Sequence, residues 1–439
     1  MARGPILYEV DNMTLASGTG IATYAGNLVR SAIELGHEVD GVFSVRRSLA
    51  PGLGPLNEIL AFDSPPPDGE TMWQAAKRHA GHPFRCLFGL RPTELTLSGL
   101  VVGSTAEKFK MFDRLFAVTD LKDAVSAHFW LYGKLAPLKP PVQPWLFHAT
   151  QPLPLCVKGS ANVYTIHDLV PLRLPHTTLD DKKYFYRMLL ALAKNADHIV
   201  TVSEHSRRDI VEFLGVDEKR VTNTYQPVEF PPHLLARSDD DIALDLERSF
   251  GLTPGDYFLY YGAIEPKKNV ARLVDAYVAS GVDHPLIVVG GKGWQNQTDL
   301  RKLGNERFSS YRFDGTRLTR HRQVRRFDYL PLERLVSLIR GARAVLFPSI
   351  YEGFGLPVVE AMLLGTPVIT SNSTALAEVA GDAALLADPY SVDDLASAIR
   401  TIDSDQDLRQ SLAERGRCRA RTFSRAAHNA RLQDLYGRL

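Results

Sequence analysis

The chain has 439 residues, of which 45% are hydrophobic, and its formal net charge is +1 at pH 7. This length exceeds that of one ordinary domain, so we expect two domains with sizeable cores. Because acidic and basic residues nearly balance, the composition gives no reason to expect nucleic acid as a partner. The three cysteines (Cys86, Cys156 and Cys418) have neither metal nor disulfide spacing, which favours reduced thiols and a cytoplasmic location.

The N-terminal residues do not have the pattern of a signal peptide, because the apolar run Ile6–Tyr8 is too short. No apolar stretch of the sequence approaches the roughly 18 residues needed to cross a bilayer. A membrane-spanning segment is therefore not expected, whereas peripheral contact with the inner face of a membrane stays open.

The first half begins with the pattern of a βαβ unit. In chain order the expected elements are a strand at Ile6–Val10, a loop with Gly18 and Gly20, a helix from Ile21 to Leu35 capped by Gly36, and a strand at His37–Phe43. Residues 64–143 are less regular. There the apolar and basic residues from Phe109 to Phe116 predict an amphipathic helix, for which packing in the core is favoured over membrane contact.

Regular alternation of strands and helices returns after residue 144. Strands are expected at Trp145–His148, Val163–Ile166 and Asp197–Ser203, and helices at Lys182–Lys194 and from Glu204. The stretch from Pro227 to Phe250 contains two adjacent prolines and the acidic run Asp239–Asp241. We expect an interdomain linker at 231–250, with the acidic run as a solvated turn rather than a metal site.

The second half repeats the alternation more regularly. Its strands are expected at Tyr257–Tyr261, Leu286–Val289, Ala344–Phe347 and Pro367–Thr370, and its helices at Val270–Ala279, Pro331–Arg340 and Pro357–Leu364. Such alternation predicts an α/β fold with parallel sheets covered by helices. We therefore expect two Rossmann-like domains, 1–230 and 251–423, facing a central cleft, and a last helix at 424–439.

The most informative segment is Glu352-Gly-Phe-Gly-Leu-Pro-Val-Val-Glu360, which follows the buried strand ending at Phe347. Glu352 is expected on the loop at the carboxyl end of that strand, and Glu360 in the first turn of the next helix. The glycines between them let the backbone approach a ligand closely. Two carboxylates beside exposed backbone N–H groups suit a ligand with many hydroxyls and an anionic centre, such as a nucleotide sugar.

Two lysines follow another strand of the same half. Lys267 and Lys268 stand in the loop Gly262–Asn269 at the start of a helix. A helix N-terminus with two ammonium groups favours a diphosphate, although a solvated lysine pair is an equally good interpretation of the spacing alone. In the first half His167 follows a strand in the same way; a hydrogen-bonded structural histidine is the alternative there, and His148 is a second, weaker candidate.

Taken together, these strings resemble glycosyltransferase family 4, whose members are retaining enzymes of GT-B fold with an E-x7-E motif. The resemblance is strong from Ser349 to Ser371 and also covers the loop around Lys268 and the segment Tyr164–Pro171, whereas it is faint over residues 50–143. It implies that the helix 424–439 crosses back onto the first domain. Lys267 stands where the family usually has arginine, so bidentate phosphate binding is not expected there.

The resemblance also implies a role for each matched residue. His167 would contact the transferred sugar, Lys268 the leaving diphosphate and Glu352 the hydroxyls of the donor sugar. The remaining donor-binding positions would be Gly18, Gly20, Lys267, Tyr329, Leu330, Phe354, Gly355, Leu356 and Glu360, with Glu360 on the ribose and Tyr329-Leu330 beside the nucleobase.

The expected function is that of a retaining, metal-independent hexosyltransferase without a cofactor, using a nucleotide sugar as donor. The Glu265–Asn269 string resembles mannosyltransferases of bacterial surface polysaccharide synthesis, which favours GDP-mannose over UDP sugars and a glycan or lipid-linked glycan as acceptor. A sugar phosphorylase or nucleotide-sugar epimerase of the same architecture is the alternative, as is a nucleotide-sugar-binding protein without turnover. A dinucleotide-dependent oxidoreductase is disfavoured, because Gly18-Thr-Gly20 lacks the third glycine of the fingerprint.

Overall fold

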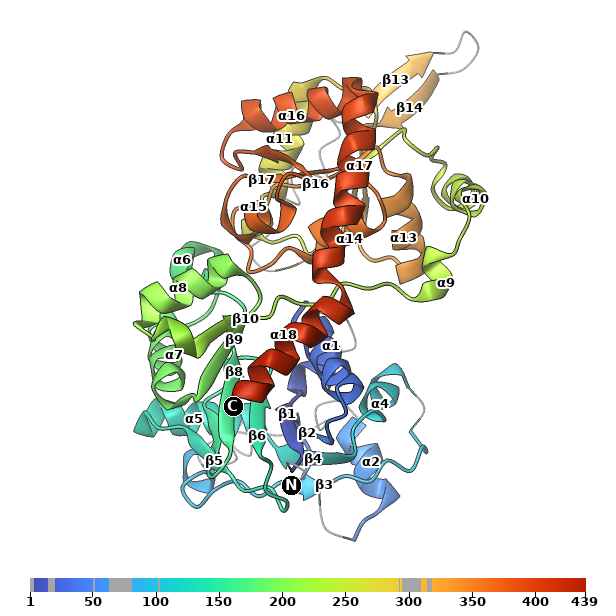
Figure 1. Ribbon diagram of the computed structural model, residues 1–439. Coiled ribbons are helices and arrows are strands. Elements are labelled where there is room, and N and C mark those ends of the chain that lie inside the picture. Colours follow the sequence, from blue (N-terminus) through green and yellow to red (C-terminus); the bar gives the residue numbers. More distant parts are fainter. Residues whose placement is uncertain are drawn as a thin grey trace.

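The computed structural model describes residues 4–14, 20–49, 52–62, 81–101, 103–291, 293, 309–313 and 318–439. Within them the chain forms two lobes, each built on its own sheet (Figure 1). Gly18, one of the predicted donor-binding residues, lies outside the described residues.

The first lobe contains an eight-stranded sheet with the order β10-β9-β8-β6-β1-β2-β4-β3. Its strands are β1 (Ile6–Glu9), β2 (Val39–Val45), β3 (Thr93–Glu94), β4 (Arg114–Thr119), β6 (Leu146–Ala149), β8 (Ala161–Thr165), β9 (His198–Thr201) and β10 (Val221–Asn223). Neighbouring strands are parallel except β3 and β4. The central strands are buried on both faces, which is why they appear in the sequence as continuous apolar runs.

Helices connect these strands, and a short parallel pair lies beside the sheet. The helices are α1 (Gly20–Glu34), α2 (Pro55–Phe62), α4 (Ser104–Phe109), α5 (Leu121–Tyr132), α6 (Val170–Arg173), α7 (Lys182–Asn195) and α8 (Glu204–Leu214), and the pair is β5 (Ala136–Leu138) with β7 (Leu155–Val157). Because these strands are parallel, their carboxyl ends lie along one edge of the sheet, and the chain passes from each strand into the next connection at that edge.

The predicted amphipathic helix from Phe109 to Phe116 is wrong. α4 ends at Phe109, and Leu115 and Phe116 lie on β4, whose four middle residues are buried. Gly41 of the neighbouring β2 makes room for the ring of Phe112, since a Cβ at that position would lie 3.0 Å from it. A short apolar run fits a helix face and a buried strand equally well, and burial within the sheet decides between them.

The second lobe contains a six-stranded parallel sheet with the order β15-β12-β11-β16-β17-β18. Its strands are β11 (Phe258–Tyr261), β12 (Leu286–Val289), β15 (Val324–Phe327), β16 (Ala344–Phe347), β17 (Val368–Ser371) and β18 (Leu385–Ala387), with an antiparallel hairpin of β13 (Ser309–Phe313) and β14 (Leu318–Arg322). Its helices are α11 (Val270–Ser280), α13 (Leu332–Gly341), α14 (Leu356–Leu363), α15 (Thr374–Ala380), α16 (Val392–Ser404) and α17 (Gln406–Ala420).

Residues 231–250, expected as a linker, are largely helical. They form α9 (Pro232–Leu235) and α10 (Asp239–Phe250), and the acidic run Asp239–Asp241 is exposed to solvent, as expected, but forms the first turn of α10. The Ser238 hydroxyl accepts a hydrogen bond from the Asp241 N–H, and the Asp241 carboxylate accepts one from the Ser238 N–H. This reciprocal cap and the acidic first turn both favour a helix start.

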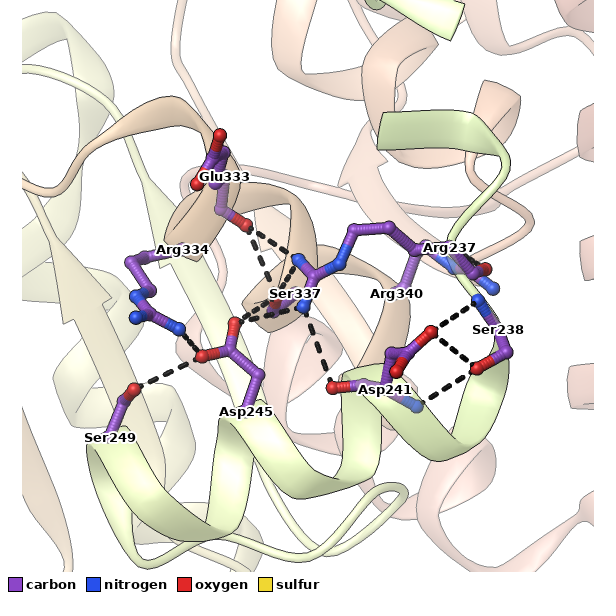
Figure 2. A network of polar contacts seen from close by, with 9 residues as sticks. All are labelled: Arg237, Ser238, Asp241, Asp245, Ser249, Glu333, Arg334, Ser337 and Arg340. Carbon is purple, nitrogen blue, oxygen red and sulfur yellow. Dashed lines mark hydrogen bonds and ion pairs between the residues drawn. The ribbon is translucent and has the colours of Figure 1, made fainter. Parts of the chain in front are cut away.

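α10 is fixed to α13 by a polar network around the buried Asp245 (Figure 2). The Asp245 carboxylate accepts hydrogen bonds from Ser337 and from Ser249 (3.1 Å). It also pairs with Arg334 and, at 3.4 Å, with Arg237. Because these partners satisfy a buried charge that would be costly alone, α10 is anchored as a part of the second lobe.

The last helix, α18 (Arg425–Arg438), leaves the second lobe and lies against the first (Figure 1). The Tyr436 hydroxyl lies 2.8 Å from that of Tyr8 on β1 and 2.7 Å from Nδ1 of His148 on β6. At the other end of α18, Arg425 pairs with Glu229 and donates to Asn27 of α1. The C-terminal helix thus contributes side chains to the core of the first lobe.

Candidate active site

The second lobe brings Lys268 and Glu352 into direct contact. Lys268 belongs to the turn after β11, and Glu352 to the loop after β16, the neighbouring strand. The Lys268 Nζ lies 2.6 Å from Oε1 of Glu352, and the Ser349 hydroxyl donates to the same oxygen at 2.6 Å. The Lys267 Nζ lies 3.8 Å from the other carboxylate oxygen. Two cations therefore converge on one carboxylate at the carboxyl edge of the sheet.

Backbone hydrogen bonds hold the two loops in this register. The N–H of Ile350 donates to the Lys267 carbonyl at 2.7 Å, and the Ser349 hydroxyl oxygen lies 2.9 Å from that carbonyl. Asn269 takes a left-handed conformation (φ 63°) and donates from its side chain to the Pro348 carbonyl at 3.1 Å. The charged side chains are therefore set on a rigid frame rather than on mobile loops.

Charge on this cluster is stabilised despite its burial. Burial tends to raise the pKa of Glu352, but Lys268, Lys267 and the Ser349 hydrogen bond outweigh it, so the pKa is lowered. Burial tends to lower the pKa of Lys267, but Glu352, Asp168 and Glu265 outweigh it, so the pKa is raised. Lys267 and Glu352 are therefore ionised at neutral pH, and the Lys267 ammonium supplies fixed positive charge for an anionic ligand.

Glu360 lies apart from this ion pair and has the opposite electrostatic character. α14 begins at Leu356 with Gly355 as its N-cap (φ 104°), so Glu360 lies in the second turn rather than in the first. Burial raises the pKa of Glu360 to about 7, and a hydrogen bond from the Tyr261 hydroxyl offsets part of that rise. Glu360 is therefore poised to change charge near neutral pH.

In the first lobe, His167 follows β8 and is fixed from two sides. Its Nε2 lies 2.9 Å from the Thr150 carbonyl, and its ring meets the Tyr24 ring edge-on at 4.7 Å. A carbonyl can only accept, so Nε2 carries the proton and Nδ1 is left as the acceptor in the neutral ring. Burial lowers the pKa of His167, which keeps that neutral form at physiological pH.

The two halves of the site meet where Gly353 contacts the first lobe. A Cβ on Gly353 would lie 2.6 Å from the His167 carbonyl oxygen and 2.9 Å from the Asp168 Cβ, so only glycine fits there. A Cβ on Gly20, at the start of α1, would lie 3.5 Å from Leu356 of the opposite lobe. The loop carrying Glu352 is thus seated directly against the loop carrying His167.

A cavity of about 290 Å³ lies between the lobes beside these contacts. It is lined by residues of α1, of the crossing segment 227–232 and of α14, including Asn27, Arg30, Leu356 and Glu360. Glu360 therefore faces a space that both lobes border, as a residue that contacts a bound ligand must.

Other predicted donor-binding residues lie differently. The Phe354 side chain packs among the rings of Tyr225 (6.3 Å) and Phe423 (5.3 Å), so only its backbone is placed to meet a ligand. Tyr329 and the half-buried Leu330 follow β15, two strands away from β11. The Tyr329 side chain is 79% exposed, and the structure does not bring it to the Lys268–Glu352 pair.

His148, the weaker histidine candidate, is structural. It is fully buried, and its ring nitrogens bond to the Tyr436 hydroxyl and, at 2.9 Å, to the Thr165 hydroxyl. Burial lowers the pKa of His148 to about 3. Both of its nitrogens are occupied inside the lobe, so it has no capacity left for a ligand.

Sequence reasoning missed Glu9, a buried acid at the carboxyl end of β1. Its Oε1 accepts hydrogen bonds from the Asp11 N–H (3.1 Å) and from Gln151 (3.0 Å), whereas its Oε2 has no hydrogen-bond partner among the described residues. Burial, followed by the nearby Asp11 charge, raises the pKa of Glu9 to about 7. The Thr150 hydroxyl donates to the Glu9 carbonyl (2.8 Å), which links Glu9 to the strand edge that holds His167. The sequence does contain a signal for this residue, because Glu9 is an acidic residue at the end of the first expected strand.

Two features are absent from the described part of the chain. No group of three or more His, Cys, Asp or Glu side chains is arranged there to hold a metal ion. No helix among those residues combines the length and apolarity needed to cross a membrane.

Two opposed α/β lobes, with cations and carboxylates on one side of the junction and a neutral histidine on the other, define a glycosyltransferase of GT-B fold. The family described as "Glycosyl transferases group 1" matches residues 247–419, and "Glycosyltransferase Family 4" matches residues 115–229. The chain belongs to this family of glycosyltransferases.

Individual relatives agree with that assignment. The chain is 33% identical over 267 residues to O-antigen chain mannosyltransferase B of Escherichia coli, a match that covers 60% of this chain and 66% of that protein. It is 26% identical over 268 residues to the serotype-specific mannosyltransferase WbdA of the same organism, covering 60% of this chain and 31% of WbdA. The structure of Anabaena HepE in complex with UDP and glucose has the same fold, with a TM-score of 0.65, 14% identity and 100% of both chains covered.

Proposed function

We propose that this protein is a retaining mannosyltransferase that transfers mannose from GDP-mannose to a hydroxyl of a glycan or lipid-linked glycan during surface polysaccharide synthesis. The observation that carries the proposal is the meeting of Lys268 and Glu352 with His167 and Asp168 through Gly353. The mannosyltransferase relatives support the choice of sugar.

In the proposed reaction the bond between the sugar anomeric carbon and the diphosphate oxygen breaks, and the acceptor oxygen forms the new bond on the same face. Lys268 and Lys267 stabilise the charge that develops on the leaving diphosphate. Such electrostatic stabilisation of the transition state is usually the largest single contribution to catalysis. A phosphate oxygen of the leaving group takes the acceptor proton. His167 accepts a hydrogen bond from a sugar hydroxyl at Nδ1, and Glu352 accepts one from another hydroxyl.

The test is to incubate the purified protein with a panel of nucleotide sugars and a mannosylated acceptor, with and without EDTA, and to measure released nucleotide. We expect turnover with GDP-mannose that survives EDTA, and NMR of the product should show the anomeric configuration of the donor. An inverted product would contradict the retaining mechanism. Absence of turnover with every donor would contradict the transferase assignment, and release of sugar phosphate on addition of phosphate would indicate a phosphorylase instead.

A further inference from the structure

Asp209 on α8 is a buried acid of the first lobe whose partners come from both lobes. Its side chain is 2% exposed. From the first lobe, Arg173 of α6 donates through Nε to Oδ1 of Asp209 at 3.1 Å. From the second lobe, the Tyr351 hydroxyl donates to Oδ2. One carboxylate therefore binds a side chain from each lobe, and α6 and α8 lie at the end of the first lobe that faces the second (Figure 1).

The two partners of Asp209 stand next to the two halves of the candidate active site. Tyr351 immediately precedes Glu352 in the chain. Arg173 ends α6, the short helix that begins three residues after His167. Asp209 is thus linked through one side chain to the loop that carries Glu352, and through the other to the element that follows His167.

A second hydrogen bond to α8 lies on the other side of Glu352. The Ser206 hydroxyl donates to the Gly353 carbonyl at 3.3 Å. Ser206 and Asp209 are three residues apart, so they lie on one face of α8. The residues before and after Glu352 are therefore both bonded to one helix of the opposite lobe, while the Glu352 carboxylate itself pairs with Lys268.

The N-terminus of α8 also receives a cap from the second lobe. The Glu378 carboxylate, on α15, accepts from the N–H groups of Glu204 and His205 at 2.8 and 2.7 Å. A helix leaves such N–H groups unpaired at its start, and a negative charge there is favourable. Tyr351, Gly353 and Glu378 all bond to α8, so this helix fixes the second lobe against the first.

The Tyr351 hydroxyl has little freedom to bond elsewhere. Tyr351 is 5% exposed, and its ring lies 5.5 Å from that of His205. Burial, followed by the hydrogen bond to Asp209, raises the pKa of Tyr351 far above its ordinary value, so the hydroxyl keeps its proton and acts as a donor. A hydrogen bond to a carboxylate that is paired with arginine is among the stronger kinds, which suits it to holding a loop in place.

We propose that Asp209 is a positioning residue for the transfer reaction, and that it sets Glu352 against His167 through Tyr351 and Arg173. The inference rests on the proposed function, in which Glu352 and His167 contact different hydroxyls of one sugar. Two groups on separate lobes can do so only while the distance between them is fixed, and an error of about 1 Å can cost about 100-fold in rate. Asp209 acts through its two partners and does not itself contact the sugar.

The first experiment is Tyr351→Phe, which removes the hydroxyl and keeps the ring. We expect kcat with GDP-mannose to fall about 10- to 100-fold. The Kd of GDP, measured by calorimetry, should change by less than about twofold, because the groups expected to bind the nucleotide stay in place. Asp209→Asn weakens both links and should lower kcat at least as much. An unchanged kcat in Tyr351→Phe, or a loss confined to GDP affinity, would overturn the proposal.

The matched control is Tyr257→Phe. The Tyr257 hydroxyl is also buried and donates at 2.7 Å, but its acceptor, the Leu338 carbonyl, belongs to the same lobe. This variant should lower Tm while the folded protein keeps its kcat within about twofold. An equal loss of kcat in Tyr257→Phe would assign the effect to stability and count against positioning.

A double-mutant cycle tests whether Tyr351 acts through Glu352. In a Glu352→Ala background the group to be positioned is missing, so adding Tyr351→Phe should lower the rate by less than about threefold. Single-turnover assays at high enzyme concentration make these slow variants measurable. The same loss with and without Glu352 would show a purely structural bond and overturn the proposal.

Hydrogen exchange separates this inference from the proposed function, because it requires no donor. In Tyr351→Phe the N–H groups of Glu204 and His205, which bond to Glu378 of the other lobe, should exchange at least about threefold faster. In Tyr257→Phe they should exchange at the unmodified rate. Unaltered exchange in Tyr351→Phe would overturn the inference even if the protein transfers mannose. Faster exchange in a protein that turns over no donor would contradict the proposed function and leave the link between the lobes supported.

Discussion

The two halves of the candidate site are built in opposite ways. In the second lobe, Lys268 and Glu352 are charged, compensate each other at 2.6 Å and come from two loops that are bonded to each other. In the first lobe, His167 is neutral and is held by a backbone carbonyl and the edge of the Tyr24 ring. One half is organised by charge, and the other by packing.

In the proposed reaction this difference gives the two halves separate tasks. Fixed charges stabilise a diphosphate as its negative charge grows, which requires them to be rigid before the ligand arrives. A neutral imidazole positions a sugar hydroxyl without competing for the diphosphate. The Lys268 ammonium is paired with Glu352, so a donor must share this ammonium or displace Glu352 from it. Substitutions in the two halves should therefore affect kcat and nucleotide affinity differently.

The largest effect is expected for Lys268→Ala. Loss of this ammonium should lower kcat about 100- to 1,000-fold, because the leaving diphosphate loses a stabilising charge. The measurement is steady-state turnover of GDP-mannose. Lys267→Ala is the comparison: its Nζ lies farther from Glu352, at 3.8 Å, and a smaller loss of kcat is expected. Equal losses in the two variants would show that the lysines act as a diffuse charge.

His167→Ala should lower kcat about 10- to 100-fold, the amount expected from one lost hydrogen bond to the reacting sugar. Nucleotide affinity should change little, because His167 belongs to the other lobe. His148→Gln is the comparison, and it should reduce thermal stability while the folded fraction keeps its kcat. Loss of nucleotide affinity in His167→Ala, measured by calorimetry with GDP, would contradict the division of tasks.

Glu360 should make nucleotide binding dependent on pH. Its pKa is raised to about 7 in the free protein, and only the ionised carboxylate accepts from both ribose hydroxyls. Affinity for GDP should therefore rise as pH increases from about 6 to about 8. Glu360→Gln should remove that rise and weaken binding about tenfold at the upper pH. A pH profile unchanged by the substitution would assign the titration to another group, of which Glu9 is the first to test.

The smallest effect on activity is expected for Tyr436→Phe. The hydroxyls of Tyr8 and Tyr436 and the imidazole of His148 bond to one another inside the first lobe. Removing one hydroxyl leaves two buried groups unpaired, so the free energy of unfolding should fall by about 2–4 kcal/mol. Denaturant unfolding measures this loss, and kcat of the folded enzyme should stay within about twofold. A large change in kcat without a change in stability would give Tyr436 a role in the site.

The same contrast explains what could be predicted from the sequence. The second lobe uses residues that are adjacent in the chain, Lys267-Lys268 and the Glu352–Glu360 segment, and each follows a strand with a clear apolar run. The first lobe assembles Glu9, Thr150 and His167 from the ends of three different strands, so no local string describes it. The helix predicted at Phe109–Phe116 was wrong for a related reason. The spacing of its apolar residues fits both a helix and a strand, and only the sheet around β4 decides between them.

α18 has a consequence for how the protein reaches its native state. Strands of the first lobe end by residue 223, yet Tyr436 fills a buried position between β1 and β6. A nascent first lobe therefore leaves the ribosome with an open groove over its central strands, until some two hundred further residues have been translated. Its apolar floor would be exposed during that interval, when chains are most prone to aggregate. Deleting α18 should thus yield an insoluble product, even though none of its residues belongs to the candidate active site.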